Sequence, residues 1–164
     1  AHGLPADAAE QAAWVAQLHV RKTALFTALV SDGRLPARPG VVRLLRDALA
    51  AGRRLAVVST SAEASVRAVL EQVIGRADGR RIPVFAGDVV AAKKPDPAIY
   101  RLALSALDLP ADRTVAVEDS RNGLLAAVGA GLRCVVTVST FTRSERFDEA
   151  ALVVGVVVVL LVSW

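Results

Sequence analysis

From residue 41 onward, the sequence alternates between segments with a helical pattern and short runs of small apolar residues. The runs are rich in Val and are bounded by turn residues, which is typical of buried strands in a parallel sheet. Four such runs follow one another: RLAVVST (54–60), PVFAGD (83–88), TVAVED (114–119) and RCVVTVS (133–139). Helical patterns lie between and around them, at 41–52, 61–74, 96–108 and 121–131. Repeated β-then-α units of this kind predict an α/β fold with a doubly wound parallel sheet.

The composition agrees with this class, because 54% of the 164 residues are apolar and only 4% are aromatic. Ahead of the alternating region, residues 6–30 contain no Pro or Gly and carry apolar residues near helical spacing, which predicts one long helix or two. The turn-rich segment 31–40 is the best candidate for a linker. We therefore expect a helical segment over residues 1–34 and an α/β core over residues 35–164.

The C-terminal segment is an almost pure run of Val and Leu between Ala151 and Val162, interrupted by one Gly. It is shorter than the roughly 20 apolar residues that a membrane span requires, so no membrane partner is expected. We predict a buried strand here. An interfacial anchor and a non-native tail remain as alternatives.

The charge of the chain suggests an anionic partner without defining one. The formal net charge is +4 and the pI is about 10.0, carried almost entirely by Arg. A phosphate ester would suit this positive charge as a partner. Arg-biased codon usage, which places Arg on solvent-exposed faces, would produce the same net charge. Basic runs interleaved with aromatic residues are absent, which argues against nucleic acid as a partner. The single cysteine, Cys134, lies in an apolar stretch and is predicted to be a buried small hydrophobe.

Polar residues follow three of the predicted strands, where parallel sheets bind their ligands. They are Ser59-Thr60-Ser61, Lys93-Lys94-Pro95 and Glu118-Asp119-Ser120. Hydroxyls before a helix bind phosphate, a Lys supplies a compact positive charge, and adjacent carboxylates suit Mg²⁺. Each also has a structural reading: the hydroxyls and Asp119 or Ser120 as helix caps, and Lys94 as a solvated loop residue. Their order and shared position indicate a phosphoryl-binding site.

These segments resemble three motifs of the haloacid dehalogenase-like (HAD) hydrolase superfamily. LAVVST is similar to its second motif, KKPDPAIY to its third and VAVEDSRNGLLAA to its fourth. The resemblance covers roughly residues 36–147 and implies a Rossmann-like core. It also implies that Ser59, with Thr60 beside it, binds the phosphoryl group and that Lys94 neutralises its charge. Glu118 and Asp119 would then hold Mg²⁺.

Longer matches, among them LPARPGVVRLL and GLRCVVTVSTFT, are similar to the CbbY-like branch, which includes xylulose-1,5-bisphosphate phosphatases. The β-phosphoglucomutase-related branch shares the core motifs. The resemblance implies a small sugar phosphate as substrate, an aspartyl-phosphate intermediate, and a location in the bacterial cytoplasm or the plastid stroma. We also expect a monomer.

One family motif has no counterpart in the chain. The nucleophile of the superfamily lies in a DxDG[TV] motif, and neither Asp32-Gly33 nor Asp78-Gly79 is preceded by an Asp two positions earlier. The chain therefore looks truncated at its N-terminus, without the first strand of the family and with only a remnant of its helical cap over 1–34. We expect either a phosphatase represented without its nucleophile, or an inactive phosphate- and Mg²⁺-binding fragment or interaction module. Residues 152–162 could occupy part of the vacant strand position.

Overall fold

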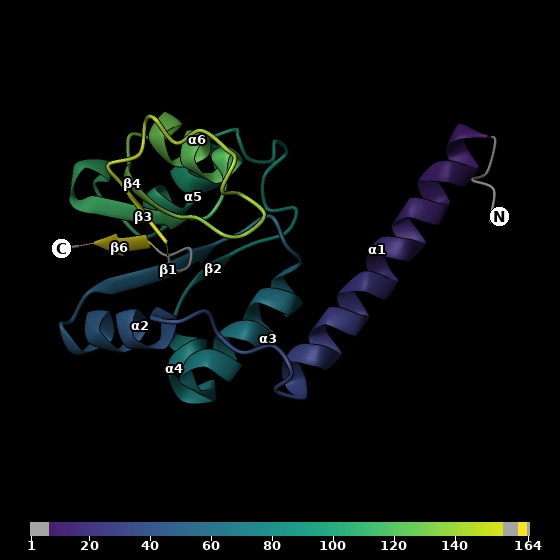
Figure 1. The fold of residues 1–164 in the computed structure, drawn as a ribbon, viewed down its shortest axis with the longest axis horizontal. Helices are drawn as coiled ribbons and strands as arrows, with labels where there is room; N and C mark the ends of the chain where they lie inside the picture. Colours follow the sequence, from purple (N-terminus) through teal and green to yellow (C-terminus); the bar gives the residue numbers. More distant parts are fainter. Residues whose placement is uncertain (1–6, 156–160, 164) are drawn as a thin grey trace.

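The computed structural model describes residues 7–155 and 161–163, and within them helices cover both faces of a six-stranded sheet (Figure 1). The strand order is β2-β1-β6-β3-β4-β5. The strands are β1 (Arg54–Val58), β2 (Val84–Phe85), β3 (Thr114–Glu118), β4 (Arg133–Thr137), β5 (Leu152–Val154) and β6 (Leu161–Ser163). The α/β class and the four strands predicted from the Val-rich runs are confirmed.

The helices lie in two layers. On one face are α2 (Val41–Ala50), α3 (Glu63–Ile74) and α4 (Arg76–Arg81), and on the other are α5 (Ala98–Ala106), α6 (Arg121–Gly129) and the short 3-10 helix η1 (Ala111–Arg113) (Figure 1). The first layer buries Leu45, Leu70 and Ile82 against the sheet. The second layer buries a larger apolar cluster that includes Tyr100 and Leu124.

The parallel register brings the carboxyl ends of the strands to one edge of the sheet. In β1 and β2, Val58 lies opposite Phe85, and in β3 and β4, Glu118 lies opposite Val136. β1 and β3 flank β6 and run in the same direction, so the polar residues that follow them emerge at the same edge of the sheet, as the sequence pattern predicted.

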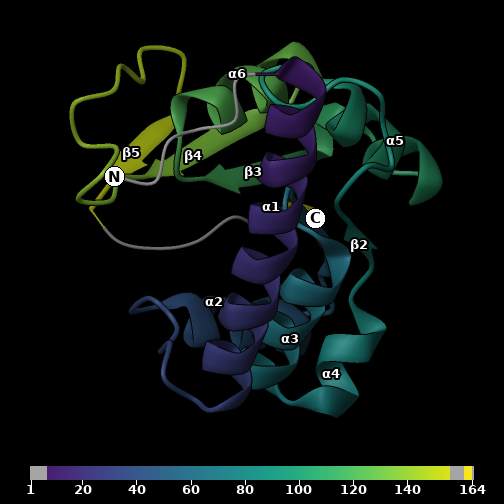
Figure 2. The same cartoon turned by 90° about the vertical axis from the view of Figure 1, so that its right-hand side faces the viewer.

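The N-terminal segment forms one continuous helix, α1 (Ala8–Ser31), which settles the choice between one helix and two. The Asp7 side chain caps it by accepting a hydrogen bond from the backbone N–H of Glu10. Of its 24 residues only Val30 is buried, and Figure 1 shows the helix projecting away from the sheet. Figure 2, turned by 90°, shows it in front of the rest of the molecule, and its contacts with the core are mainly with α3.

The C-terminal run does not form the single buried strand that its composition predicts. Its first part is β5, a parallel strand at the edge of the sheet, where Leu152 is 54% and Val153 is 46% exposed. Its last part is β6, which lies inside the sheet between β1 and β3 and runs antiparallel to both. An edge strand has one neighbour and one open side, which explains the exposure of β5.

The hypothesis that residues 152–162 fill a vacant strand position therefore applies to only part of the segment. Leu161–Ser163 pair with Arg54–Ala56 of β1 and with Thr114–Ala116 of β3, whereas Leu152–Val154 lie at the sheet edge. The residues between them, 156–160, lie outside the described part. β6 runs antiparallel to both neighbours, so it needs no crossover connection of the kind that joins parallel strands.

Candidate phosphate-binding site

The polar residues predicted from the sequence meet at the carboxyl ends of β1 and β3. Ser59 and Thr60 follow β1, Glu118 ends β3, Asp119 follows it, and Lys94 reaches in from the loop between β2 and α5. All five line one cavity of about 380 Å³. The structure thus brings together every candidate site residue that the motifs indicated.

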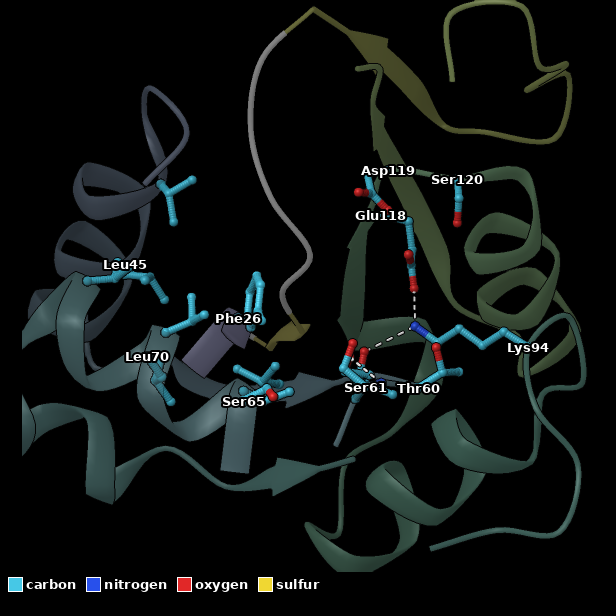
Figure 3. A pocket seen from close by; sticks show the side chains of 17 residues that line it. Phe26, Leu45, Thr60, Ser61, Ser65, Leu70, Lys94, Glu118, Asp119 and Ser120 are labelled. Atoms are coloured by element: carbon cyan, nitrogen blue, oxygen red, sulfur yellow. Dashed lines mark hydrogen bonds and ion pairs between the residues drawn. The ribbon is translucent and has the colours of Figure 1, made fainter. Parts of the chain in front are cut away.

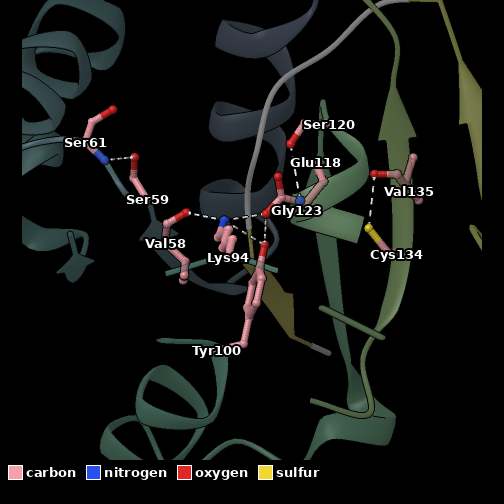
Figure 4. A network of polar contacts seen from close by, with 10 residues as sticks. All are labelled: Val58, Ser59, Ser61, Lys94, Tyr100, Glu118, Ser120, Gly123, Cys134 and Val135. Carbon is pink, nitrogen blue, oxygen red and sulfur yellow. Dashed lines mark hydrogen bonds and ion pairs between the residues drawn. The ribbon is translucent and has the colours of Figure 1, made fainter. Parts of the chain in front are cut away.

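A buried ion pair between Lys94 and Glu118 lies at the centre of this group (Figure 4). The Lys94 Nζ lies 2.5 Å from Oε1 of Glu118, and the two side chains are only 10% and 2% exposed. The same ammonium donates to the backbone carbonyl of Val58, at 3.0 Å. Lys94 therefore links the carboxyl end of β1 to that of β3. The link lies beyond the residues of these two strands that pair with β6.

Tyr100 of α5 contacts both members of this ion pair and lies below them in Figure 4. Its hydroxyl donates a hydrogen bond to Oε1 of Glu118 and lies 3.4 Å from the Lys94 Nζ. Burial, reinforced by the negative charge of Glu118, raises the pKa of Tyr100 well above its usual range. The phenol thus stays protonated and serves as a donor to the carboxylate.

The three N–H donors of Lys94 now have three oxygen neighbours: Val58, Tyr100 and Glu118. An ammonium has only three donors, so an anion arriving here must replace one of these acceptors. The Tyr100 contact is the longest of the three, at 3.4 Å, and is the one most readily exchanged.

The hydroxyl residues after β1 lie on the open side of the cavity. The Ser59 side chain accepts a hydrogen bond from the backbone N–H of Ser61, at 3.1 Å, which shapes the turn into α3. Thr60 is exposed, and its side chain forms no hydrogen bond to the described residues. Ser59 thus has the structural role of shaping a turn, and ligand binding by Ser59 and Thr60 stays a prediction.

The two residues of the acidic pair, Glu118 and Asp119, differ in burial and in their partners. Glu118 is buried and engaged, whereas Asp119 is half-buried and its carboxylate pairs with no other described residue. The next residue, Ser120, caps α6 by accepting a hydrogen bond from the backbone N–H of Gly123, at 3.2 Å. Ser120 rather than Asp119 thus fills the capping role, which leaves Asp119 available to a ligand.

The opposite wall of the cavity is apolar (Figure 3). Phe26 of α1, Leu45 of α2 and Leu70 of α3 face the polar residues across the space. A cavity with one apolar wall and a few convergent polar groups is the usual form of a small-molecule site. A small ligand with a charged group and a less polar body would match both sides.

Sequence reasoning missed two residues at this site, Tyr100 and Gly123. Tyr100 is the only tyrosine of the chain and lies inside the segment KKPDPAIY, six residues after Lys94. Gly123 lies in the first turn of α6 and is packed against the Glu118 carboxylate. A Gly inside a helical pattern usually has a packing reason, and that signal was present in the sequence.

The chain belongs to the haloacid dehalogenase-like hydrolase family, because the sequence model of that family matches residues 4–131. Within that family its similarity is to CbbY proteins. It is 47% identical over 146 residues to a CBBY-like protein of Arabidopsis thaliana, covering 89% of this chain and 46% of that protein. It is 48% identical over 137 residues to Protein CbbY of Cereibacter sphaeroides, covering 83% of this chain and 60% of the relative. The chain thus spans about half the length of these curated relatives.

Solved structures support the same relationship. The crystal structure of CbbY from Rhodobacter sphaeroides in complex with phosphate matches with a TM-score of 0.78 and 44% identity, over 85% of this chain and 63% of that one. A variant of that protein was solved with xylulose 1,5-bisphosphate and matches equally well. A β-phosphoglucomutase-like structure from Thermotoga maritima, at 24% identity and a TM-score of 0.54, shows the fold alone.

No group of three or more His, Cys, Asp or Glu side chains among the described residues is arranged to hold a metal ion. None of the helices in the described part of the chain has the length and apolar character needed to cross a bilayer.

Proposed function

We propose that this chain carries the phosphate-binding part of a sugar-phosphate phosphatase site. The observation that carries the proposal is the cation of Lys94, which bonds to the carboxyl ends of both β1 and β3 and lines one cavity with the unpaired carboxylate of Asp119 and the exposed hydroxyl of Thr60. Phosphoryl transfer depends on positioning and on neutralising the charge of the phosphoryl oxygens, and these groups supply both. The basic net charge of +4 would favour the approach of an anionic substrate.

Each residue has a role in this proposal. Lys94 neutralises the phosphoryl group, and Ser59 and Thr60 donate hydrogen bonds to its oxygens. Glu118 keeps the Lys94 ammonium in place and Tyr100 keeps the carboxylate in place. The substrate class is a small sugar phosphate, supported by the similarity to a CbbY protein solved with a sugar bisphosphate.

The family implies Mg²⁺, and the residues present fit part of its ligand set. Asp119 offers a carboxylate that the described residues leave unpaired, and Glu118 lies beside it with Oε1 bound to Lys94. Mg²⁺ is usually held by one or two carboxylates, with water and phosphate oxygens filling the rest. We propose that Asp119 holds the ion directly and that Glu118, whose carboxylate is engaged by Lys94 and Tyr100, lies beside it; the role of the ion when bound is to neutralise phosphoryl oxygens.

The same proposal limits what the chain does alone. The family's chemistry begins with attack of an Asp carboxylate on phosphorus, and no DxDG motif occurs in the 164 residues. We therefore propose that this chain binds phosphate esters but does not turn them over above background. A phosphate-binding or interaction module without catalysis is the second candidate.

Isothermal titration calorimetry with inorganic phosphate, with and without Mg²⁺, tests the proposal. The wild-type chain is expected to bind. A double variant, Lys94→Met with Glu118→Gln, removes the cation without leaving its partner charged. We expect phosphate binding without Mg²⁺ to weaken by about 10- to 100-fold, the cost of one charged hydrogen bond.

The control is Arg46→Met, which removes one positive charge from an exposed position of α2. Arg46 does not line the cavity that holds Lys94, so phosphate affinity should change little. Equal affinity in the double variant and the wild type would refute the role of Lys94. Robust release of phosphate from sugar phosphates by this chain would show that it contains another nucleophile.

A further inference from the structure

Gly123, in the first turn of α6, is not required by its backbone. Its φ is not positive, so any residue could adopt its conformation, and Gly is among the poorest residues in a helix. The residue is buried and faces the Glu118 side chain. The reason for Gly at this position must therefore be a lack of room for a side chain and not the backbone conformation.

The Glu118 carboxylate occupies the place that a side chain at position 123 would take. A Cβ at position 123 would lie 2.8 Å from Oε1 and closer still to Oε2 and Cδ, well inside any real contact distance. The carboxylate has no easy way to yield. Its Oε1 is held by Lys94 and Tyr100, and the side chain is 2% exposed.

We propose that Gly123 is a positioning residue of this site, an inference that rests on the proposed function. By leaving the first turn of α6 bare, Gly123 lets the Glu118 carboxylate lie between α6 on one side and Lys94 and Tyr100 on the other. The three contacts fix one orientation of the carboxylate. That orientation sets where Lys94 presents its charge and how Glu118 lies beside Asp119.

The same helix supplies a matched control. Gly129, at the end of α6, would place a Cβ 3.4 Å from Pro97, an ordinary contact, and it is far from Glu118. Gly123→Ala and Gly129→Ala make the same chemical change in one helix. Helix propensity favours Ala at both positions, so any difference between the variants comes from what the added methyl group meets.

Two measurements test the proposal. In urea unfolding without ligand, Gly123→Ala should lower the midpoint and Gly129→Ala should not. In a Glu118→Ala background, Gly123→Ala should no longer lower it, because the opposing carboxylate is gone. In calorimetric titration with Mg²⁺, Gly123→Ala should weaken binding by about tenfold, in the range found when residues that orient metal ligands are changed. Gly129→Ala should leave that affinity unchanged.

Each other outcome has a definite meaning. Failure of Gly123→Ala to fold, with recovery in the Glu118→Ala background, would support the clash. An equal loss of stability in both backgrounds would overturn it. A coupled loss of stability with unchanged Mg²⁺ affinity would make Gly123 a packing residue and overturn the positioning role. Absence of Mg²⁺ and phosphate binding by the wild type would overturn the proposed function itself, whereas the coupling would still show whether Gly123 makes room for Glu118.

Discussion

Replacing Lys94 by Met should destabilise the protein strongly, because it leaves the Glu118 carboxylate buried without its cation. Removing one partner of a buried ion pair costs about 3–5 kcal/mol. The pair here is well inside that class, with side chains 10% and 2% exposed. For a chain of this size each kcal/mol lowers the unfolding midpoint by about 2–4 °C, so a loss of about 6–20 °C is expected.

The double variant, Lys94→Met with Glu118→Gln, separates charge from packing. With both charges removed, the amide of Gln can still accept the hydrogen bond of Tyr100, and no buried charge remains. The double variant should therefore be more stable than Lys94→Met alone. Thermal unfolding followed by circular dichroism measures both. A Lys94→Met midpoint within about 2 °C of the wild type, a shift worth less than about 1 kcal/mol, would refute the reasoning, as would a double variant no more stable than the single one.

Three further predictions concern stability. Burial, followed by the negative charge of Glu118, raises the pKa of the Cys134 thiol from 9.0 to about 12, so between these values only the unfolded chain loses the proton. Between about pH 9 and 10 stability should then fall by up to about 1.4 kcal/mol per pH unit, a decline that urea unfolding should not find in Cys134→Val. Above about pH 10 the raised pKa of the Tyr100 phenol adds a further decline in both proteins. Ser120→Ala removes the cap of α6 and should cost about 1 kcal/mol in the same assay, whereas Ser120→Asp should retain most of it. Ending the chain at residue 160 removes β6 and should lower the midpoint and produce self-association in sedimentation velocity, because both neighbouring strand edges lose their partner.

The central strands and helices could be predicted from the sequence because their signals are local. β1, β3 and β4 are Val-rich runs between turn residues, and the helices α2, α3 and α6 begin and end close to the predicted positions. The short helix α4 was not predicted. It contains Gly79 and four charged residues within six positions, so neither its apolar pattern nor its helix propensity marks it.

The C-terminal strands show where local signals end. A run of Val indicates strand propensity and carries no information about the neighbouring strand or its direction. The place of β6 depends on edges that β1 and β3 offer from positions about 110 and 50 residues earlier in the chain, respectively. One buried strand was predicted, and two short strands in different places were found.

The candidate site was predicted in part for the same reason. Strand ends can be located from sequence, so Ser59, Lys94 and Glu118 could be grouped before their distances were known. The roles of Tyr100 and Gly123 depend on how α5 and α6 pack around one carboxylate. Tyr100 is separated from Glu118 by 18 residues, and no periodic pattern connects them.

The position of Lys94 has a consequence for genetic studies of the protein. Because its ammonium bonds to Val58 in one strand and to Glu118 in another, the side chain that we propose to recognise the ligand also contributes to the cohesion of the sheet. A screen that scores only loss of function would not distinguish a variant that fails to recognise its ligand from one that is degraded in the cell. Measuring the abundance of each variant alongside its function would separate the two.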